Sequence, residues 1–267
     1  TMKMVAANKL RKAQDAHRRA AVFADRLNGI ASRLALDKDL LSSPFFAPRP
    51  AVSRALLLVV TSERGLCGGF NNNLNKKVLK WISGKSGHIG RVDVSFCGRK
   101  GFVSLKNKVH VREHYEGITL KPVFADAVRI GADLRKAFLA GEADEVHLAY
   151  NVPGSALSNT PSIERLLPVE PPKLAAAAEM GIETWIVEPP GAAFVDALVP
   201  RFVNMKVFFA LLCNSVGEHG ARMAAMDSAT RNAENLIDVN TLLRNRARQS
   251  KITTELIEIV AGAEALK

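Results

Sequence analysis

The residues best suited to chemistry lie in a glycine-rich segment, residues 62–71, with the sequence Ser-Glu-Arg-Gly-Leu-Cys-Gly-Gly-Phe-Asn. The segment follows an apolar run and precedes a helical pattern, as phosphate-binding loops do. A P-loop needs Lys and then Ser or Thr after its last glycine, where this chain has Phe70 and Asn71. The spacing of Gly65, Gly68 and Gly69 also differs from the dinucleotide fingerprint. We therefore predict a structural turn and no bound cofactor.

Histidine and cysteine residues form no recognisable metal or catalytic set. His110 and His114 could share one helix face, but they lie in a strand-like region without a third ligand nearby. Cys67, Cys97 and Cys213 stand apart from one another, which favours a reducing compartment. Because no nucleophile, base and orienting group can be recognised together, we predict no catalytic residues, no metal site and no enzymatic activity.

Composition narrows the class of protein. The chain has 267 residues, is 48% hydrophobic and carries a formal net charge of +11. Its strongest apolar stretches, 55–60 and 207–213, are far shorter than the roughly 18 residues that cross a bilayer. The positive charge predicts an anionic partner, which could be a nucleic acid, a membrane surface or an acidic protein. The chain begins at Thr1 already in helical register, so we expect that its natural N-terminus is missing.

Apolar residues near the N-terminus recur in steps of three and four, which is typical of a helix packed lengthwise on another helix. This predicted seam consists of Ala13, Ala16, Ala20, Phe23, Leu27, Ile30 and Leu34. An ordinary surface helix on a globular core is the alternative interpretation. Residues 41–50 contain Ser and Pro and are interpreted as a linker.

The middle of the chain alternates short apolar strands with helical stretches, which predicts an α/β domain with a largely parallel sheet. The predicted strands are 55–61, 92–97, 109–113, 146–150, 163–169 and 184–187, and the predicted helices include 73–82 and 125–140.

From residue 192 to 264 the pattern is helical, interrupted only by Pro200, Gly217 and Gly220. A continuous helix of this span would be ~110 Å long, whereas a domain of the middle region's size should be only ~40 Å across. Part of the helix must therefore lie outside the globular body, and we expect its apolar stripe to pair with the N-terminal seam. That stripe is Ile252, Leu256, Ile259, Val260 and Ala263.

The predicted fold is thus an α/β chain with a Rossmann-like middle domain and a long coiled coil formed by the N- and C-terminal helices. Its parts are residues 1–48, an N-terminal helix with linker; residues 49–190, the α/β domain; and residues 191–267, the long C-terminal helix.

Four segments resemble the gamma subunits of F-type rotary ATP synthases. Residues 62–71 match the family's Asp-Arg-Gly-Leu-Cys-Gly-Gly-Phe-Asn run, with Glu63 in place of the usual Asp. Residues 1–10 resemble the family's N-terminal helix, and residues 221–226 resemble a segment of its C-terminal helix. The most specific match is the run Ala-Arg-Gln-Ser-Lys-Ile-Thr-Thr-Glu-Leu-Ile-Glu-Ile-Val-Ala-Gly-Ala at 247–263.

This resemblance implies a bacterial-type central rotor shaft that couples proton translocation to ATP synthesis or hydrolysis at catalytic sites on the beta subunits. It implies an antiparallel coiled coil inside a ring of alpha and beta subunits, with the α/β domain at the foot. The expected partners are the alpha, beta and epsilon subunits and the membrane c-ring, without nucleic acid or membrane insertion. The expected location is the cytoplasmic face of the bacterial inner membrane, as a peripheral part of the complex.

The resemblance also assigns contact residues. Those expected to meet the alpha and beta ring are Met2, Arg222, Arg248, Gln249, Thr253, Glu255 and Glu258. Those expected to meet the epsilon subunit and the membrane ring are Trp185 and Glu188. The stretch 244–251 is rich in Arg and Lys and contains no acid, so it should seek carboxylates. A solvated basic face is the plainer interpretation of such a stretch.

Two other functions stay open from the residues alone. A basic coiled-coil protein that binds nucleic acid should show a basic stripe with stacking aromatics, whereas aromatic residues make up only 6% of this chain. An α/β enzyme that uses the glycine-rich turn to bind a nucleotide lacks the expected phosphate-binding residues.

Overall fold

The computed structural model describes residues 1–34, 43–47, 49, 51–85, 89–154, 158–169 and 192–265. Their elements in chain order are α1 (Met2–Leu34), β1 (Arg54–Val60), α2 (Phe70–Lys85), β2 (Arg91–Cys97), α3 (Arg99–Leu105), β3 (His110–Tyr115), the 3-10 helix η2 (Ile118–Leu120), α4 (Phe124–Leu139), β4 (Glu145–Pro153), β5 (Asn159–Leu167) and α6 (Ala192–Ala265).

The five strands form one sheet in the order β3-β2-β1-β4-β5. The pairs β3–β2, β2–β1 and β1–β4 are parallel, and β5 runs antiparallel to β4 at the edge. The central strand β1 is almost continuously apolar because both of its faces are covered, as in parallel sheets generally. The predicted Rossmann-like α/β domain is therefore confirmed, with one antiparallel edge strand.

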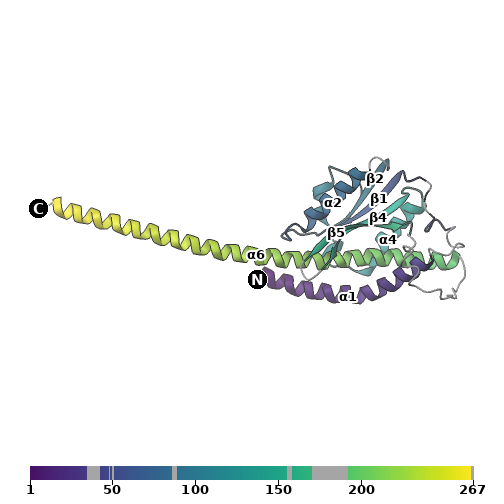
Figure 1. Cartoon of the computed structure of the whole chain (residues 1–267), viewed down its shortest axis with the longest axis horizontal. Helices are drawn as coiled ribbons and strands as arrows, with labels where there is room; N and C mark the ends of the chain where they lie inside the picture. Colours follow the sequence, from purple (N-terminus) through teal and green to yellow (C-terminus); the bar gives the residue numbers. More distant parts are fainter. Residues whose placement is uncertain are drawn as a thin grey trace. The chain divides into compact units, whose positions relative to one another are not determined.

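Helices cover both faces of the sheet (Figure 1). On one face, Leu56, Leu58 and Val60 of β1 belong to a core that also contains apolar residues of α1, α4 and α6. On the other face, Ala55, Leu57 and Val59 pack with residues of α2 and α3. Alternate residues of one strand thus serve two separate cores, as the two-residue period of a strand requires.

Most predicted elements are present with shifted ends. Helix α2 begins and ends a turn or less beyond the predicted range 73–82. The short helix α3 was not predicted; it follows Gly98, whose φ of 100° is open to glycine but strained for other residues. The predicted strand 184–187 lies outside the described residues.

Helix α1 buries a stripe that coincides only in part with the predicted seam. Phe23 is 54% exposed, and Ala24 is buried in its place. His17 contacts α6 through Phe209 and Cys213. The observed seam is Ala6, Leu10, Ala13, His17, Ala20, Ala24 and Leu27. It shares Ala13, Ala20 and Leu27 with the predicted seam, and the predicted Ile30 also packs against the core. Ala24 takes the place of the bulkier Phe23, because a small side chain lets two helices approach closely.

The partner of this seam is the first part of α6. Leu10 and Ala13 cluster with Val216, while His17 lies 4.8 Å from Phe209 between ring centroids. Higher residue numbers in α1 meet lower numbers in α6, so the two helices are antiparallel, and Figure 1 shows α1 beside α6. The predicted antiparallel pairing of terminal helices is confirmed, but the partner of the seam lies earlier in α6 than the predicted stripe.

Helix α6 is continuous through Pro200, Gly217 and Gly220. The chain forms two compact units, Thr1–Ala224 and Ala225–Lys267, and the second contains the distal part of α6. In that unit Ile252, Leu256, Ile259 and Val260 are all exposed. Within the described residues, no helix combines the length and apolarity needed to cross a membrane.

Candidate functional site

The glycine-rich turn between β1 and α2 is held in one conformation by its own side chains. The Ser62 backbone N–H donates to Asn71 Oδ1 at 3.0 Å, and Asn71 Nδ2 donates to Ser62 Oγ at 2.8 Å. Ser62 Oγ also contacts the carbonyl oxygen of Arg64 at 2.7 Å. Within this frame Leu66 has a φ of 64°, which is uncommon for a residue other than glycine, and is 66% exposed. The turn therefore presents one apolar side chain outward on a strained backbone.

Glu63 ties the turn to two neighbouring segments. Its carboxylate accepts hydrogen bonds from the backbone N–H of Arg99 at 3.1 Å and of Gly117 at 2.9 Å. These donors belong to the first residue of α3 and to the residue just before η2. A carboxylate that accepts backbone N–H groups forms charge-assisted bonds, which are stronger than neutral ones. The residue that departs from the family's usual Asp thus has a defined structural task.

Helix α6 covers the other side of the turn. Asn214 Nδ2 donates to the carbonyl oxygen of Thr61 at 3.2 Å. Gly217 lies so close that an added Cβ would meet Phe70 Cε2 at 2.7 Å. Arg222 Nη2 donates to the carbonyl oxygen of Gly65 at 3.1 Å and pairs with Glu218 at 2.7 Å. The first part of α6 therefore packs along the turn from its start to its end.

The chemistry of this contact favours a structural turn. Phosphate-binding loops direct several backbone N–H groups at an anion, whereas here backbone carbonyl groups face the cationic Arg222. Burial raises the pKa of the Cys67 thiol, so Cys67 is not an activated nucleophile at neutral pH. The same cause raises the pKa of Cys213 to about 12. The arrangement supports the interpretation of this segment as a turn that joins elements.

The two histidines considered as metal ligands lie on β3. His114 stacks on Phe102 with ring centroids 4.2 Å apart, while His110 is exposed. In the part of the chain that the structure describes, no group of three or more His, Cys, Asp or Glu is placed to hold a metal ion.

The predicted ring-contact residues fall into two groups. Met2, 63% exposed at the start of α1, and Arg222 belong to the first compact unit. The remaining ring-contact residues are all exposed in the second unit, and these are Arg248, Gln249, Thr253, Glu255 and Glu258. Trp185 and Glu188 lie outside the described residues. The structure contains a single chain, so each of these contacts with other subunits stays a prediction.

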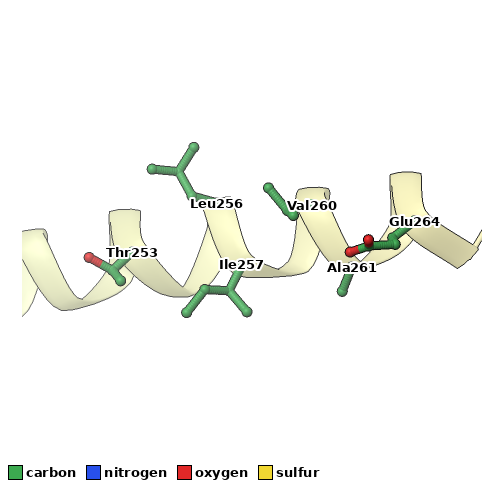
Figure 2. A pocket seen from close by; sticks show the side chains of 6 residues that line it. All are labelled: Thr253, Leu256, Ile257, Val260, Ala261 and Glu264. Carbon is green, nitrogen blue, oxygen red and sulfur yellow. The ribbon is translucent and has the colours of Figure 1, made fainter.

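Figure 2 shows the end of α6 in detail, where Leu256 and Val260 lie along one edge of an apolar face of the helix and Ile257 and Ala261 lie along its other edge. Together with Thr253 and Glu264 they line a shallow hollow. Thr253 Oγ1 donates to the backbone carbonyl of Gln249 at 2.9 Å, and Lys251 lies 3.8 Å from Glu255. Arg248 has no ion-pair partner among the described residues, so its charge is available to another molecule.

Reasoning from the sequence missed two features of the turn. The outward position of Leu66 depends on its backbone angle, which its residue type does not suggest. The bonds from Arg222 join residues about 157 positions apart in the chain, so no local pattern could reveal them. Glu63, where the chain departs from the family run, points to neither feature.

Comparisons of the sequence with a family model and with known proteins point to the same family. The sequence family described as ATP synthase matches residues 1–266. The ATP synthase gamma chain of Geobacter sp. (strain M21) is 43% identical over 266 residues, covering 100% of this chain and 92% of that protein. The ATP synthase gamma chain of Anaeromyxobacter sp. (strain Fw109-5) is 42% identical over 272 residues, with coverage of 100% and 92%.

Solved structures have the same fold. A chain from the Tetrahymena thermophila mitochondrial ATP synthase, in a structure of its central stalk and c-ring, matches with a TM-score of 0.65 and 22% identity. The match covers 86% of this chain and 97% of that one. A chain from the Euglena gracilis mitochondrial ATP synthase matches with a TM-score of 0.57 and 16% identity, covering 99% and 94%. At these identities the likeness concerns the fold alone.

Proposed function

Because this chain belongs to the family of ATP synthase gamma chains, we propose that it works as the central rotor shaft of a rotary ATP synthase. It is a non-catalytic subunit of that complex, and rotation of the shaft links proton flow to ATP synthesis or hydrolysis at sites on other subunits. Its place is the cytoplasmic face of a bacterial inner membrane, where the complex holds it peripherally.

The observation that carries this proposal is the surface of the second compact unit. Its helix exposes a wide apolar face that includes Ile252, Leu256, Ile257 and Val260. An apolar face on a helix is normally buried against a partner, while the polar face meets water. Among the described residues no other segment covers these side chains, which supports enclosure of the helix by alpha and beta subunits.

The positive charge of the same segment also supports contact with the surrounding subunits. Arg244, Arg246 and Arg248 lie within one stretch of exposed helix that contains no acid. Acidic segments on the surrounding subunits would complement this stretch, with Gln249, Thr253, Glu255 and Glu258 adding polar contacts. In this proposal Trp185 and Glu188 meet the epsilon subunit and the c-ring.

Leu66 offers a further contact from the first unit. It is an exposed apolar side chain on a turn that is fixed from several directions. A rigid apolar projection can transmit force to a partner without losing conformational freedom on binding. We include Leu66 among the residues that meet the surrounding subunits.

Rotation can drive chemistry elsewhere only if the shaft makes different contacts at different angles. A perfectly symmetric shaft would bind every subunit equally and would shift no equilibrium. The observed seam is rich in alanine on α1, whereas α6 contributes larger side chains such as Phe209 and Val216. Two chemically different helices side by side make the shaft asymmetric in cross-section.

The test is the double substitution Arg248→Ala with Gln249→Ala in the fully assembled complex. Single exposed ion pairs contribute only ~0.2 to 1 kcal/mol, so one substitution should be mild and two together should disturb several contacts. We expect assembly to persist and ATP turnover, or proton pumping per ATP hydrolysed, to fall severalfold.

A matched control is Lys106→Ala with Asn107→Ala, which removes one charge and one amide at an exposed turn of the α/β domain. The control should leave turnover and pumping unchanged. Normal turnover and pumping in the assembled Arg248 and Gln249 variant would show that the shaft is not gripped there.

A further inference from the structure

Arg222 makes an unusual set of contacts for an arginine near the surface of a helix. Its side chain is only 18% exposed. Nη2 donates to the carbonyl oxygen of Gly65 at 3.1 Å and to that of Arg64 at 3.4 Å, and Nε reaches the Gly65 oxygen at 3.3 Å. The planar guanidinium thus holds two consecutive carbonyl groups of the turn with fixed geometry, which a lysine could not reproduce.

A buried carboxylate orients this guanidinium. Glu218, one helical turn earlier in α6, has a side chain that is 8% exposed and lies 2.7 Å from Arg222 Nη2. Burial raises the pKa of Glu218, and the positive charge of Arg222 opposes that rise. Breaking a buried pair by removing one partner is costly because the other charge stays uncompensated. Glu218 and Arg222 therefore hold each other in place.

His219 lies against the same guanidinium, with Nδ1 3.3 Å from Arg222 Nη1. Burial lowers the pKa of His219 to about 4, and the charges of Arg222 and Lys9 act in the same direction. At neutral pH the imidazole is therefore uncharged, and its Nδ1 can accept a hydrogen bond from the guanidinium. Arg222 thus has partners on two sides within α6 and on a third side in the turn.

Arg222 lies where its contacts connect α6 to the sheet. It lies in the last helical turn of the first compact unit, which ends at Ala224. The turn that it holds is fixed at Glu63 to the start of α3 and to the residue before η2. A continuous set of bonds therefore runs from α6 through the turn to the carboxyl edge of the sheet.

We propose that Arg222 is a positioning residue that locks the glycine-rich turn to α6, so that a twist of the helix is passed to the α/β domain. The lock also fixes the outward position of Leu66. This role is distinct from the subunit contact that the family resemblance assigns to Arg222, because it operates inside a single chain. The part that concerns torque rests on the proposed rotor function, whereas the lock itself does not.

Hydrogen–deuterium exchange of the full chain tests the lock. In Arg222→Gln, we expect amides of residues 62–71 and 99–101 to exchange at least tenfold faster than in the unsubstituted chain. Amides of β1 and β4 should keep their rates. Arg231→Gln is the matched control, since Arg231 also pairs with an acid four residues earlier in α6, and it should leave the turn unchanged.

The variant Arg222→Lys separates geometry from charge. Lysine keeps the charge opposite Glu218 but lacks the planar fork, so exchange of the turn should lie between that of Arg222→Gln and the unsubstituted chain. Unchanged exchange of the turn in Arg222→Gln overturns the proposal and leaves a contact with another subunit as the role of Arg222. Faster exchange throughout the sheet also overturns it, because Arg222 would then be a general stabiliser.

The torque role has its own measurement in the assembled complex. Arg222→Gln should lower the number of protons pumped per ATP hydrolysed, while Arg222→Lys restores part of it. Normal pumping in a variant whose turn exchanges tenfold faster would overturn the torque role and leave the lock intact. The grip that the proposed rotor function places on the distal part of α6 is tested separately, through the Arg248 and Gln249 variant.

Discussion

Gly217 shows how a single residue type sets the approach of two elements. A Cβ at this position would lie 2.4 Å from Asn159 Oδ1 and 2.7 Å from Phe70 Cε2, both closer than real Cβ atoms pack. Asn159 Nδ2 also donates to the Gly217 carbonyl at 3.4 Å. Glycine in a helix interior costs conformational entropy, so the close contact with β5 and α2 must outweigh that cost.

Gly217→Ala should therefore destabilise the protein by about 1 to 3 kcal/mol, because the side chain overpacks a tight interface. Chemical denaturation measures the change. The control Gly29→Ala places the same methyl group in α1, where nothing lies within 4 Å, and should stabilise the chain by about 0.5 to 1 kcal/mol. Equal effects of the two substitutions would contradict the packing argument.

A second residue-scale feature is a buried charged cluster on β4 and β5. Glu145 accepts from Arg165 at 3.0 Å and lies 2.9 Å from His147 Nε2. Burial would raise the pKa of Glu145, but its hydrogen bonds with His147 and Arg165 hold the value below the usual range. Burial lowers the pKa of His147, and the adjacent Glu145 offsets this only in part.

Acidification should weaken the fold through His147. Below its ordinary pKa of 6.5 the unfolded chain binds a proton that the folded chain resists, so the free energy of unfolding falls with falling pH. Denaturation curves between pH 7.5 and 5 measure this slope. His147→Gln keeps an N–H donor toward Glu145 without titrating, so its slope should be shallower. An identical slope would show that His147 does not contribute.

At the scale of elements, α1 is defined by which of its faces meets α6. The observed seam repeats in steps of four and three from Ala6 to Leu27, which is a heptad pattern. The predicted seam had the same period and shares Ala13, Ala20 and Leu27 with the observed one. The period of the apolar residues cannot show which of two adjacent stripes is buried, because Phe23 and Ala24 are both apolar. The distance to the neighbouring helix determines which side chain fits.

Substitutions on the two stripes should differ in effect. Leu27→Ala removes a buried side chain of the observed seam and should cost about 2 to 4 kcal/mol. Phe23→Ala removes a larger but exposed side chain and should change stability by less than about 0.5 kcal/mol. Thermal unfolding of both variants measures the difference. A larger loss from Phe23→Ala would restore the predicted seam.

Helix α4 meets α6 at another close crossing. Gly131 faces Asn204, whose Oδ1 would lie 2.3 Å from an added Cβ. Arg135 Nη1 donates to the same Asn204 oxygen at 2.8 Å and to the carbonyl of Pro200 at 3.3 Å. The first part of α6 is thus fastened to the domain near Pro200 and again near Arg222.

At the scale of the whole molecule, the two compact units differ in how they are stabilised. Residues 1–224 contain the sheet and both of its cores. Residues 225–265 are a single helix whose side chains are mostly exposed. Isolated helices gain little from propensity alone, so we expect contact with partner subunits to stabilise the second unit.

Removing residues 252–267 should therefore leave the first unit folded, with an unchanged thermal midpoint by circular dichroism. Removing residues 2–17, a segment of the same length, should lower the midpoint because Ala6, Leu10 and Ala13 are buried in the first unit. Unfolding of the whole chain on removal of residues 252–267 would show that the first unit does not fold independently.

The sequence by itself determined the family, the α/β class and the pairing of terminal helices. These follow from local signals, namely the run at 247–263, the apolar strands of the middle region and the three-four period of α1. Such signals depend on residues that are neighbours in the chain, so they can be recognised without coordinates.

Only the tertiary structure decided which stripe of α1 is buried, where along α6 it packs, and which groups Arg222 contacts. Each of these depends on distances between residues that are remote in sequence. Ala24 is buried and Phe23 is exposed because the room beside the neighbouring helix fits only the smaller side chain. Gly65 contacts Arg222 because β1 and α6 converge at the end of the sheet. Residue types specify what a side chain can do, and the packing of distant segments specifies which partner it finds.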